Sequence, residues 1–412
     1  MKALQTKLLK LSLLAIMTAA VALSSGRIAP AQNSVTEAPT GFDNLTNGLV
    51  DQATFDFDRT VFETHKTIAD GLGPIYNGNS CSDCHRNPGP GGISQVTNLR
   101  AGHLNGTSFV EALGGSLISD LSTYPSIQER VPGGNEVRTF RTSLNTLGDG
   151  FVECIQGSTL QDISDSQPPS MRGQFIRVPV LESPGTLRPG RFGWKNQNAS
   201  LMSACADEFL NQVGITNSLL TNENTSLGIS VAAFDAVPDP EDHFIEGRPH
   251  GTDLEAITEF IRASKAPPRD FPLAVTQDAQ MGENLFQQIG CVICHVRNII
   301  TAPPGTVING GTFVVPVALG DKLIHPYSDF LLHDVGTGDG IVQSGGASTR
   351  NKLRTPPLWG MRTRDRLMHD GAALSRTDAI LRHSGEATLV IHNFRNLSAN
   401  QQSQLITFLN SL

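Results

Sequence analysis

Apolar residues recur at helical spacing in two segments near the end of the chain, residues 276–290 and 397–412. The apolar positions that share one helix face are Gly282, Leu285, Phe286 and Ile289 in the first segment, and Leu405, Phe408, Leu409 and Leu412 in the second. Ser398 and Gln401 have the spacing of a capping box at the start of the second segment. The pattern predicts two amphipathic helices.

The first half of the chain has a weaker version of the same arrangement. Residues 57–71 predict one helix, and residues 253–268 predict another that stops at Pro267. The apolar face of the later segment consists of Leu254, Ile257, Phe260 and Ile261. The 40 glycines and 24 prolines indicate long, turn-rich connections between such helices. We therefore expect a mainly α protein with long loops.

The N-terminus is typical of an export signal. Lys2, Lys7 and Lys10 precede the apolar run 11–23, and "APA" at 29–31 offers a cleavage site. We expect a signal peptide over 1–31, cleaved after Ala31, and a periplasmic or otherwise exported protein; an uncleaved membrane anchor is the alternative. The formal net charge is −8, and the charged residues that cleavage would remove are all basic, so the mature chain would be more acidic. Such an acidic chain argues against nucleic acid as a partner and permits a basic redox partner.

Two short motifs carry the clearest chemistry, "CSDCH" at 81–85 and "CVICH" at 291–295. In each motif two thiols can add to the vinyl groups of haem, and the adjacent imidazole can bind its iron. A zinc site would need both cysteine pairs in one small module, and a redox C-x-x-C would need a strand–helix setting. We therefore predict two covalent haem c groups, held by Cys81, Cys84 and His85, and by Cys291, Cys294 and His295.

The other two cysteines, Cys154 and Cys205, leave two interpretations open. In an oxidising compartment they could form one disulfide. Alternatively they are separate buried thiols that pack as small hydrophobic residues.

A helix before C-x-x-C-H and an amphipathic helix at the end resemble a class I cytochrome c domain. Two such units account for the chain. We predict an N-terminal haem domain over 45–264 that carries a large insertion, a linker at 265–272, and a C-terminal cytochrome c domain over 273–412.

Several longer stretches resemble one family. They include "DGLGPIYNGNSCSDCH", "FGWKNQNASLMSACADEFLNQVGITN" and "LRTPPLWGMRTRDRLMHDGAALSRTDAILRHSGEA". Over residues 50–412 the chain resembles the di-haem oxidoreductases, which carry the labels "putative peroxidase" and "putative thiol oxidoreductase". These are related to bacterial di-haem cytochrome c peroxidases. The resemblance implies a peroxide-reacting haem in the first domain and an electron-transfer haem in the second.

The resemblance also assigns roles to single residues. It implies His383 as the sixth ligand of the second haem, opposite His295, and Trp194 as the tryptophan between the haems. His103 is a candidate distal ligand of the first haem; the alternative is a loop histidine without contact to iron. His333 and His369 could ligate iron, but we favour hydrogen bonds to haem propionates or to the backbone. The relatives also bind a calcium ion, for which the sequence assigns no ligands.

Peroxide cleavage needs a side chain that moves a proton. The relatives place an acid where this chain has Gln212, and an amide cannot shuttle a proton. Glu208, Asp207 and Glu153 are the candidate substitutes. We expect an oxidoreductase with peroxidase-like chemistry at the first haem, served by a soluble or membrane redox partner and a small oxidant such as hydrogen peroxide. The alternative is a non-catalytic electron-transfer protein in which both haems are six-coordinate.

Overall fold

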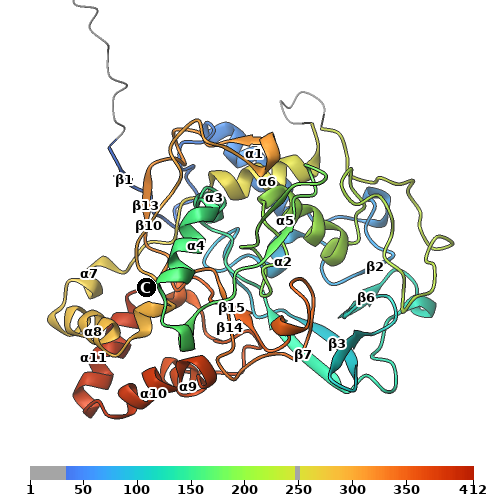
Figure 1. Cartoon of the computed structure of the whole chain (residues 1–412). Helices are drawn as coiled ribbons and strands as arrows, with labels where there is room; N and C mark the ends of the chain where they lie inside the picture. The colour runs from blue at the N-terminus through green and yellow to red at the C-terminus, as the bar shows by residue number, and fades with distance from the viewer. Residues whose placement is uncertain (1–33, 246–250) are drawn as a thin grey trace, which may run out of the picture. The chain divides into compact units, whose positions relative to one another are not determined.

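The computed structural model describes residues 34–245 and 251–412 (Figure 1). The predicted signal peptide, residues 1–31, lies outside the described residues. Within the described part, no helix combines the length and the apolar character that crossing a bilayer requires.

Helices are distributed along the whole described chain. They are α1 (Gln52–Glu63), α2 (Cys81–Cys84), α3 (Asp149–Glu153), α4 (Gly157–Ser166), α5 (Leu201–Glu208), α6 (Asp253–Ala263), α7 (Phe271–Ala274), α8 (Gln277–Gln288), α9 (Arg376–Leu381), α10 (Thr388–Arg395) and α11 (Ala399–Asn410). A π-helical turn, Phe209–Val213, continues α5. Short 3₁₀ turns supplement these helices, one of them at Cys291–Ile293.

Strands are short except in one sheet. They are β1 (Thr36–Glu37), β2 (Ile75–Tyr76), β3 (Thr97–Asn105), β4 (Ser108–Glu111), β5 (Leu117–Ile118), β6 (Leu121–Ser122), β7 (Val137–Thr142), β8 (Arg177–Pro179), β9 (Leu187–Pro189), β10 (Ile299–Ile300), β11 (Val307–Ile308), β12 (Phe313–Val314), β13 (Lys322–Ile324), β14 (Leu332–His333) and β15 (Leu353–Arg354). Antiparallel pairs dominate, and β1 runs parallel to β13.

The expectation of a mainly α fold is wrong, because the described chain is mixed α/β with 32% helical and 17% strand residues. The longest strand, β3, pairs antiparallel with β7 on one side and with β4 and β5 on the other. This sheet fills part of the predicted insertion. Most other strands have only two or three residues, which is too short to show the period-two pattern that identifies a strand in sequence.

The helix pair predicted at the C-terminal end is confirmed. Helices α8 and α11 cross, and all the predicted apolar positions on them are buried. At the crossing, a Cβ on Gly282 would lie 2.0 Å from the carbonyl oxygen of Gln404, so only glycine permits this approach. Phe286 and Phe408 pack with ring centroids 5.2 Å apart. The capping box of Ser398 and Gln401 is present.

The corresponding pair in the first half is α1 and α6. Phe260 of α6 packs against Phe55 and Phe62 of α1, at centroid distances of 5.2 and 4.8 Å. The first helix lies earlier than residues 57–71, because the Asp51 side chain accepts a hydrogen bond from the Thr54 N–H and starts it there. Phe62 then faces the His85 ring at 6.4 Å.

The predicted linker, residues 265–272, is held at both ends. Ala266 bridges to Thr40, and Asp270 caps α7 through the Leu273 N–H. The division of the chain at this linker stays a prediction.

Candidate functional site

Two cavities surround the two cysteine–histidine motifs. The N-terminal cavity is lined by Cys81, Cys84 and His85, and the C-terminal cavity by Cys291, Cys294 and His295. The first motif folds as the single turn α2, which a capping box between Ser80 and Asp83 fixes. The cavities have three wall residues in common, Leu144, Trp194 and Arg354.

Three histidine rings in these cavities are oriented in the same way. In each, Nδ1 faces a backbone carbonyl oxygen: His85 faces Gly92 at 3.2 Å, His295 faces Tyr327 at 3.0 Å, and His383 faces Ala379 at 2.8 Å. A carbonyl can only accept, so Nδ1 is the protonated nitrogen and Nε2 keeps its lone pair. This arrangement fixes the tautomer of a metal-binding imidazole.

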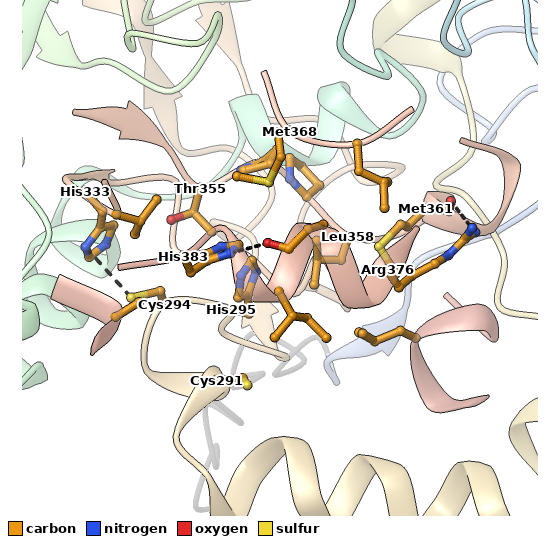
Figure 2. A pocket seen from close by; sticks show the side chains of 18 of the residues that line it. Cys291, Cys294, His295, His333, Thr355, Leu358, Met361, Met368, Arg376 and His383 are labelled. Atoms are coloured by element: carbon orange, nitrogen blue, oxygen red, sulfur yellow. Dashed lines mark hydrogen bonds between the residues drawn. The ribbon is translucent and has the colours of Figure 1, made fainter. Parts of the chain in front are cut away.

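His295 and His383 project into the same C-terminal cavity (Figure 2). His383 lies two residues beyond the end of α9, a helix that the Ser375 side chain caps by accepting from the Asp378 N–H. The cavity therefore offers two imidazoles with available Nε2 atoms beside the sulfurs of Cys291 and Cys294.

Four polar atoms in the wall of the C-terminal cavity are buried and have no hydrogen-bond partner among the described residues. They are Thr337 Oγ1, Trp359 Nε1, His369 Nδ1 and Arg376 Nε. Buried donors normally find an acceptor, so these atoms match a ligand that carries carboxylates. Haem has two carboxylates, an apolar ring and an iron. The apolar wall of the cavity fits the ring, and the histidines fit the iron.

His333 also lines the C-terminal cavity, but both of its ring nitrogens are occupied. Nε2 lies 2.8 Å from Asp329 Oδ2, and Nδ1 lies 2.6 Å from Glu386 Oε2. Although burial alone would lower it, the pKa of His333 rises to about 12 because of the Asp329 charge and these hydrogen bonds. A charged imidazole has no lone pair for iron.

The N-terminal cavity differs from the C-terminal one in its histidines. Of the described residues that line it, His85 is the only histidine. His103 lies on β3 opposite Val110 and is outside this lining. Its role as a distal ligand stays a prediction without support from this geometry.

Two carboxylates line the N-terminal cavity, Glu208 at the end of α5 and Asp149 at the start of α3. Glu208 is solvent-exposed, and it lines the N-terminal cavity. The protein atoms packed around its carboxyl still exclude part of the water, which raises the pKa of Glu208 to about 7, and the charge of Asp207 adds to the rise. Removal from water likewise raises the pKa of Asp149 to about 8, against the opposing charge of Arg354.

Gln212 also lines the N-terminal cavity, on the π-helical turn that follows Glu208. Its Oε1 accepts a hydrogen bond from Asn98 Nδ2 at 2.8 Å, and a hydrogen bond with Glu208 opposes the rise in the pKa of that acid. π-Helical turns are frequent at functional sites, because they re-aim side chains.

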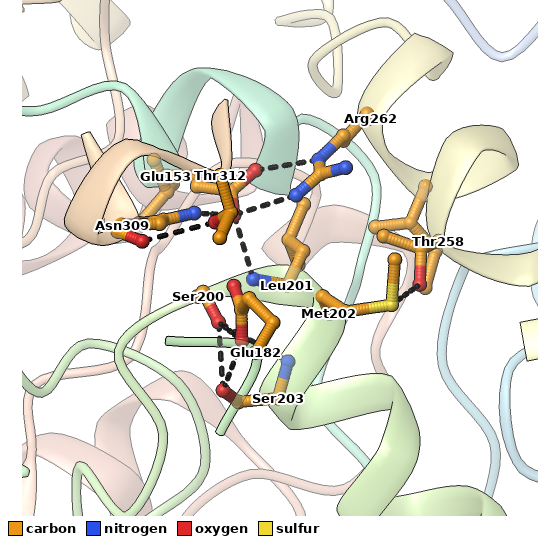
Figure 3. Close-up of polar contacts among 12 residues, drawn as sticks. Glu153, Glu182, Ser200, Leu201, Met202, Ser203, Thr258, Arg262, Asn309 and Thr312 are labelled. Carbon is orange, nitrogen blue, oxygen red and sulfur yellow. Dashed lines mark hydrogen bonds and ion pairs between the residues drawn. The ribbon is translucent and has the colours of Figure 1, made fainter. Parts of the chain in front are cut away.

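Glu153, another predicted acid, lies elsewhere, in a buried network with Arg262 and Asn309 (Figure 3). Arg262 donates to both of its carboxylate oxygens, at 2.7 and 3.0 Å, and the Leu201 N–H donates at 2.8 Å. Although burial alone would raise it, the pKa of Glu153 falls to about 2 because of the Arg262 charge. Glu153 is therefore a structural anion.

Trp194 lies in the wall between the cavities and is only 6% exposed. Its Nε1 donates to the Thr142 carbonyl at 2.8 Å, and its ring meets the edge of His369 at 6.2 Å. The Arg364 guanidinium lies over the ring at 5.9 Å. The tryptophan is thus held by a hydrogen bond and by contacts with His369 and Arg364.

The two further cysteines are free thiols in the structure, and both are buried. Cys205 lines the N-terminal cavity, whereas Cys154 lies outside the described lining of either cavity.

Sequence reasoning missed the charged residues of the N-terminal cavity. These are Arg100, Arg141, Asp149 and Arg354. Arg141 donates to Asp339 at 2.8 and 2.6 Å, and the buried Lys195 lies 3.0 Å from the same carboxylate. Asp339 belongs to the glycine-rich "GTGDG", so that motif anchors two buried cations. No spacing in the sequence relates these residues.

The comparison with protein families agrees with this cofactor. The family model described as "Di-haem oxidoreductase, putative peroxidase" matches residues 137–412. No curated protein matches the chain.

Solved structures with similar backbones include hydrazine synthase from Kuenenia stuttgartiensis, with 15% identity, 92% coverage of this chain and 90% of that chain, and a TM-score of 0.40. A MauG-like protein associated with microbial copper homeostasis has 15% identity, 92% and 93% coverage, and a TM-score of 0.40. The di-haem peroxidase BthA from Burkholderia thailandensis has 14% identity, 92% and 94% coverage, and a TM-score of 0.40.

Proposed function

The chain belongs to this di-haem oxidoreductase family, and on that premise we propose that it is an exported di-haem c-type cytochrome that reduces peroxide. Cys81 and Cys84 would attach one haem and Cys291 and Cys294 the other, through thioether bonds. When bound, each haem supplies a redox-active iron, and an iron with an open position can react with peroxide.

The contrast between the two cavities carries the proposal. In the C-terminal cavity, His295 and His383 both keep an Nε2 lone pair, and both would bind the iron of an electron-transfer haem. In the N-terminal cavity, His85 would bind the iron. The described lining offers no second histidine there, but it does offer Glu208 and Gln212. A cavity with one imidazole and an acid suits a substrate position.

Glu208 is the group that we assign to proton transfer. A carboxyl whose pKa is about 7 can both accept and release a proton near neutral pH. Gln212 would hold this carboxyl in place, since Asn98 fixes the far end of the amide. Gln212 therefore orients, and Glu208 carries the proton.

Electrons would come from a soluble or membrane redox partner and pass between the cavities beside Trp194. The alternative function, an electron carrier with two six-coordinate haems, needs a distal ligand such as His103 in the N-terminal cavity. The position of His103 on β3, outside the described lining of that cavity, favours the enzyme.

Electron paramagnetic resonance of the ferric and half-reduced holoprotein tests this assignment. We expect one low-spin signal from the bis-histidine iron and one high-spin signal from the open iron. Two low-spin signals in both states would favour the carrier.

Variant kinetics then identify the acid. Glu208→Gln should slow peroxide turnover by about 10²–10⁴-fold, since that is the usual contribution of a positioned acid–base group. Asp149→Asn, a carboxylate-to-amide change in the same cavity, should slow it far less. The reverse order would assign the role to Asp149.

The resemblance also implies a calcium ion. Among the described residues, the carboxylates of Glu223, Asp235 and Glu241 lie within 4.8 Å of one another, and Glu223 Oε1 is buried without a hydrogen-bond partner. Carboxylate oxygens are the ligands that calcium prefers. Calorimetric titration of the chelated protein with calcium tests this site; no binding heat would remove it.

A further inference from the structure

A third cavity adjoins the N-terminal one. We call it the polar cavity; its polar wall residues include Arg100, Ser116, Glu129, Asp207, Glu208 and Asn224. Arg100 and Glu208 line both this cavity and the N-terminal cavity, so the two spaces meet at these side chains. Exposed residues Glu111 and Gly114 form part of the outer wall. The polar cavity therefore connects the surface with the acid that we assign to catalysis.

Asp207 lies beside this junction and lines only the polar cavity. Its Oδ2 accepts from Asn198 Nδ2 at 2.9 Å, and its Oδ1 accepts from Asn211 Nδ2 at 2.8 Å. Asn211 Oδ1 in turn accepts from Asn224 Nδ2 at 3.0 Å, which extends the polar chain along the wall. Among the described residues, the side-chain donors to the Asp207 carboxylate are the amides of Asn198 and Asn211, so no salt-bridge hydrogen bond holds it in the ionised form, although the nearby charge of Arg100 favours that form.

The other carboxylates of the polar cavity are less suited to pass a proton. Glu129 is 6% exposed, and its oxygens accept from the N–H groups of Ser119 and Leu227 at 2.6 and 3.0 Å. Glu111 is an exposed residue of β4 in the outer wall. Asp207 alone is adjacent to Glu208 in the chain.

We propose that the polar cavity is the proton entry of the N-terminal cavity, with Asp207 as the positioning carboxylate that reloads Glu208. This inference rests on the proposed peroxidase function. Reduction of one hydrogen peroxide to two waters takes two electrons from the reduced redox partner and two protons from solvent. Each proton would pass from water in the polar cavity to the Asp207 carboxylate, and from Asp207 to Glu208.

The charges around the pair set its pH behaviour. The ionisable groups that interact electrostatically with Glu208 include Asp207 next to it on α5, Arg100 on β3, Arg141 on β7 and Cys84 on α2. Asp207 disfavours the ionised form of Glu208, whereas the two arginines favour it. Removal of the Asp207 charge should therefore lower the pKa of Glu208 and extend activity to more acidic pH.

The test is peroxide turnover of the holoprotein as a function of pH for Asp207→Asn, Glu208→Gln and a control. Asp162→Asn on α4 removes the same charge at an exposed position outside the described lining of all three cavities. We expect Asp207→Asn to slow turnover by about tenfold and to move the acidic limb to lower pH. The control should change neither quantity.

The outcomes separate the two proposals. If Glu208→Gln leaves turnover unchanged, the proposed function of Glu208 fails. If Glu208→Gln is inactive but Asp207→Asn keeps the wild-type rate and pH profile, the relay fails and the catalytic assignment stands. Should Asp207→Asn not take up haem, the wild-type rate in D₂O decides the matter: a relay predicts slower turnover in D₂O at saturating peroxide, and equal rates would overturn it.

Discussion

At the residue scale, the acid that we assign to proton transfer in the N-terminal cavity lies at position 208 and not at position 212. The family resemblance places an acid at position 212, where this chain has glutamine, and Glu208 lies four residues earlier. Residues four apart share a helix face, so an acid at either position reaches the same cavity. Through the hydrogen bond between the two side chains, the glutamine holds the carboxyl of Glu208.

His383 provides a second test at the residue scale. His383→Ala would remove one of two Nε2 atoms from the C-terminal cavity, so the iron held by His295 should change from low-spin to high-spin. Optical and magnetic resonance spectra of the ferric holoprotein measure this change. His325→Ala is the matched control, because this histidine lies outside both cavities and pairs with Glu37. An unchanged spectrum in His383→Ala would remove His383 from the iron.

At the scale of elements, the sequence predicts the helices well where a long apolar face is buried. The crossing of α8 with α11 and the apolar face of α6 were predictable, because each repeats over several turns. The sheet around β3 was not predicted. Its strands are held by pairing with segments far away in the chain, and those partners leave no local pattern.

The site shows the same limit. The two C-x-x-C-H motifs are local patterns, whereas His383 was expected from the family resemblance, and all three line the two cavities. The polar cavity depends on tertiary packing alone, since Arg100 on β3 meets Glu208 on α5 only in the folded chain. Glu153 and Glu208 could not be distinguished from the sequence, because both are glutamates. Their environments in the folded chain give Glu153 a pKa of about 2 and Glu208 a pKa of about 7.

The crossing of α8 and α11 yields a stability prediction. Gly282→Ala places a Cβ 2.0 Å from the Gln404 carbonyl oxygen, so the helices must separate. The gain in helix propensity is about 1 kcal/mol, and overpacking costs about 1–3 kcal/mol, with the larger values expected against a backbone atom. We expect a lower free energy of unfolding in denaturant titrations. At Gly133 an added Cβ meets nothing within 4 Å, so a drop of equal size in Gly133→Ala would contradict this explanation.

At the scale of the whole molecule, the two cavities form one system because Trp194 lies in the wall of both. Trp194→Phe would remove the hydrogen bond to the Thr142 carbonyl and part of the ring that fills the wall. The free energy of unfolding should fall by about 1–3 kcal/mol, since a buried carbonyl loses its donor. The low-spin signal of the C-terminal haem should persist, because the rings of His295 and His383 are held by the carbonyl groups of Tyr327 and Ala379 and not by Trp194.

Electron transfer between the haems should be slower in this variant, and rapid reduction followed by optical spectroscopy measures the rate. Trp359→Phe is the matched comparison, because Trp359 is also buried but lines the C-terminal cavity alone. If electron transfer depends on the tryptophan that lines both cavities, only the Trp194 variant slows transfer, while both variants lose stability. Equal slowing in both variants would mean that loosened packing around the C-terminal haem, rather than the shared tryptophan, limits the exchange of electrons between the two cavities.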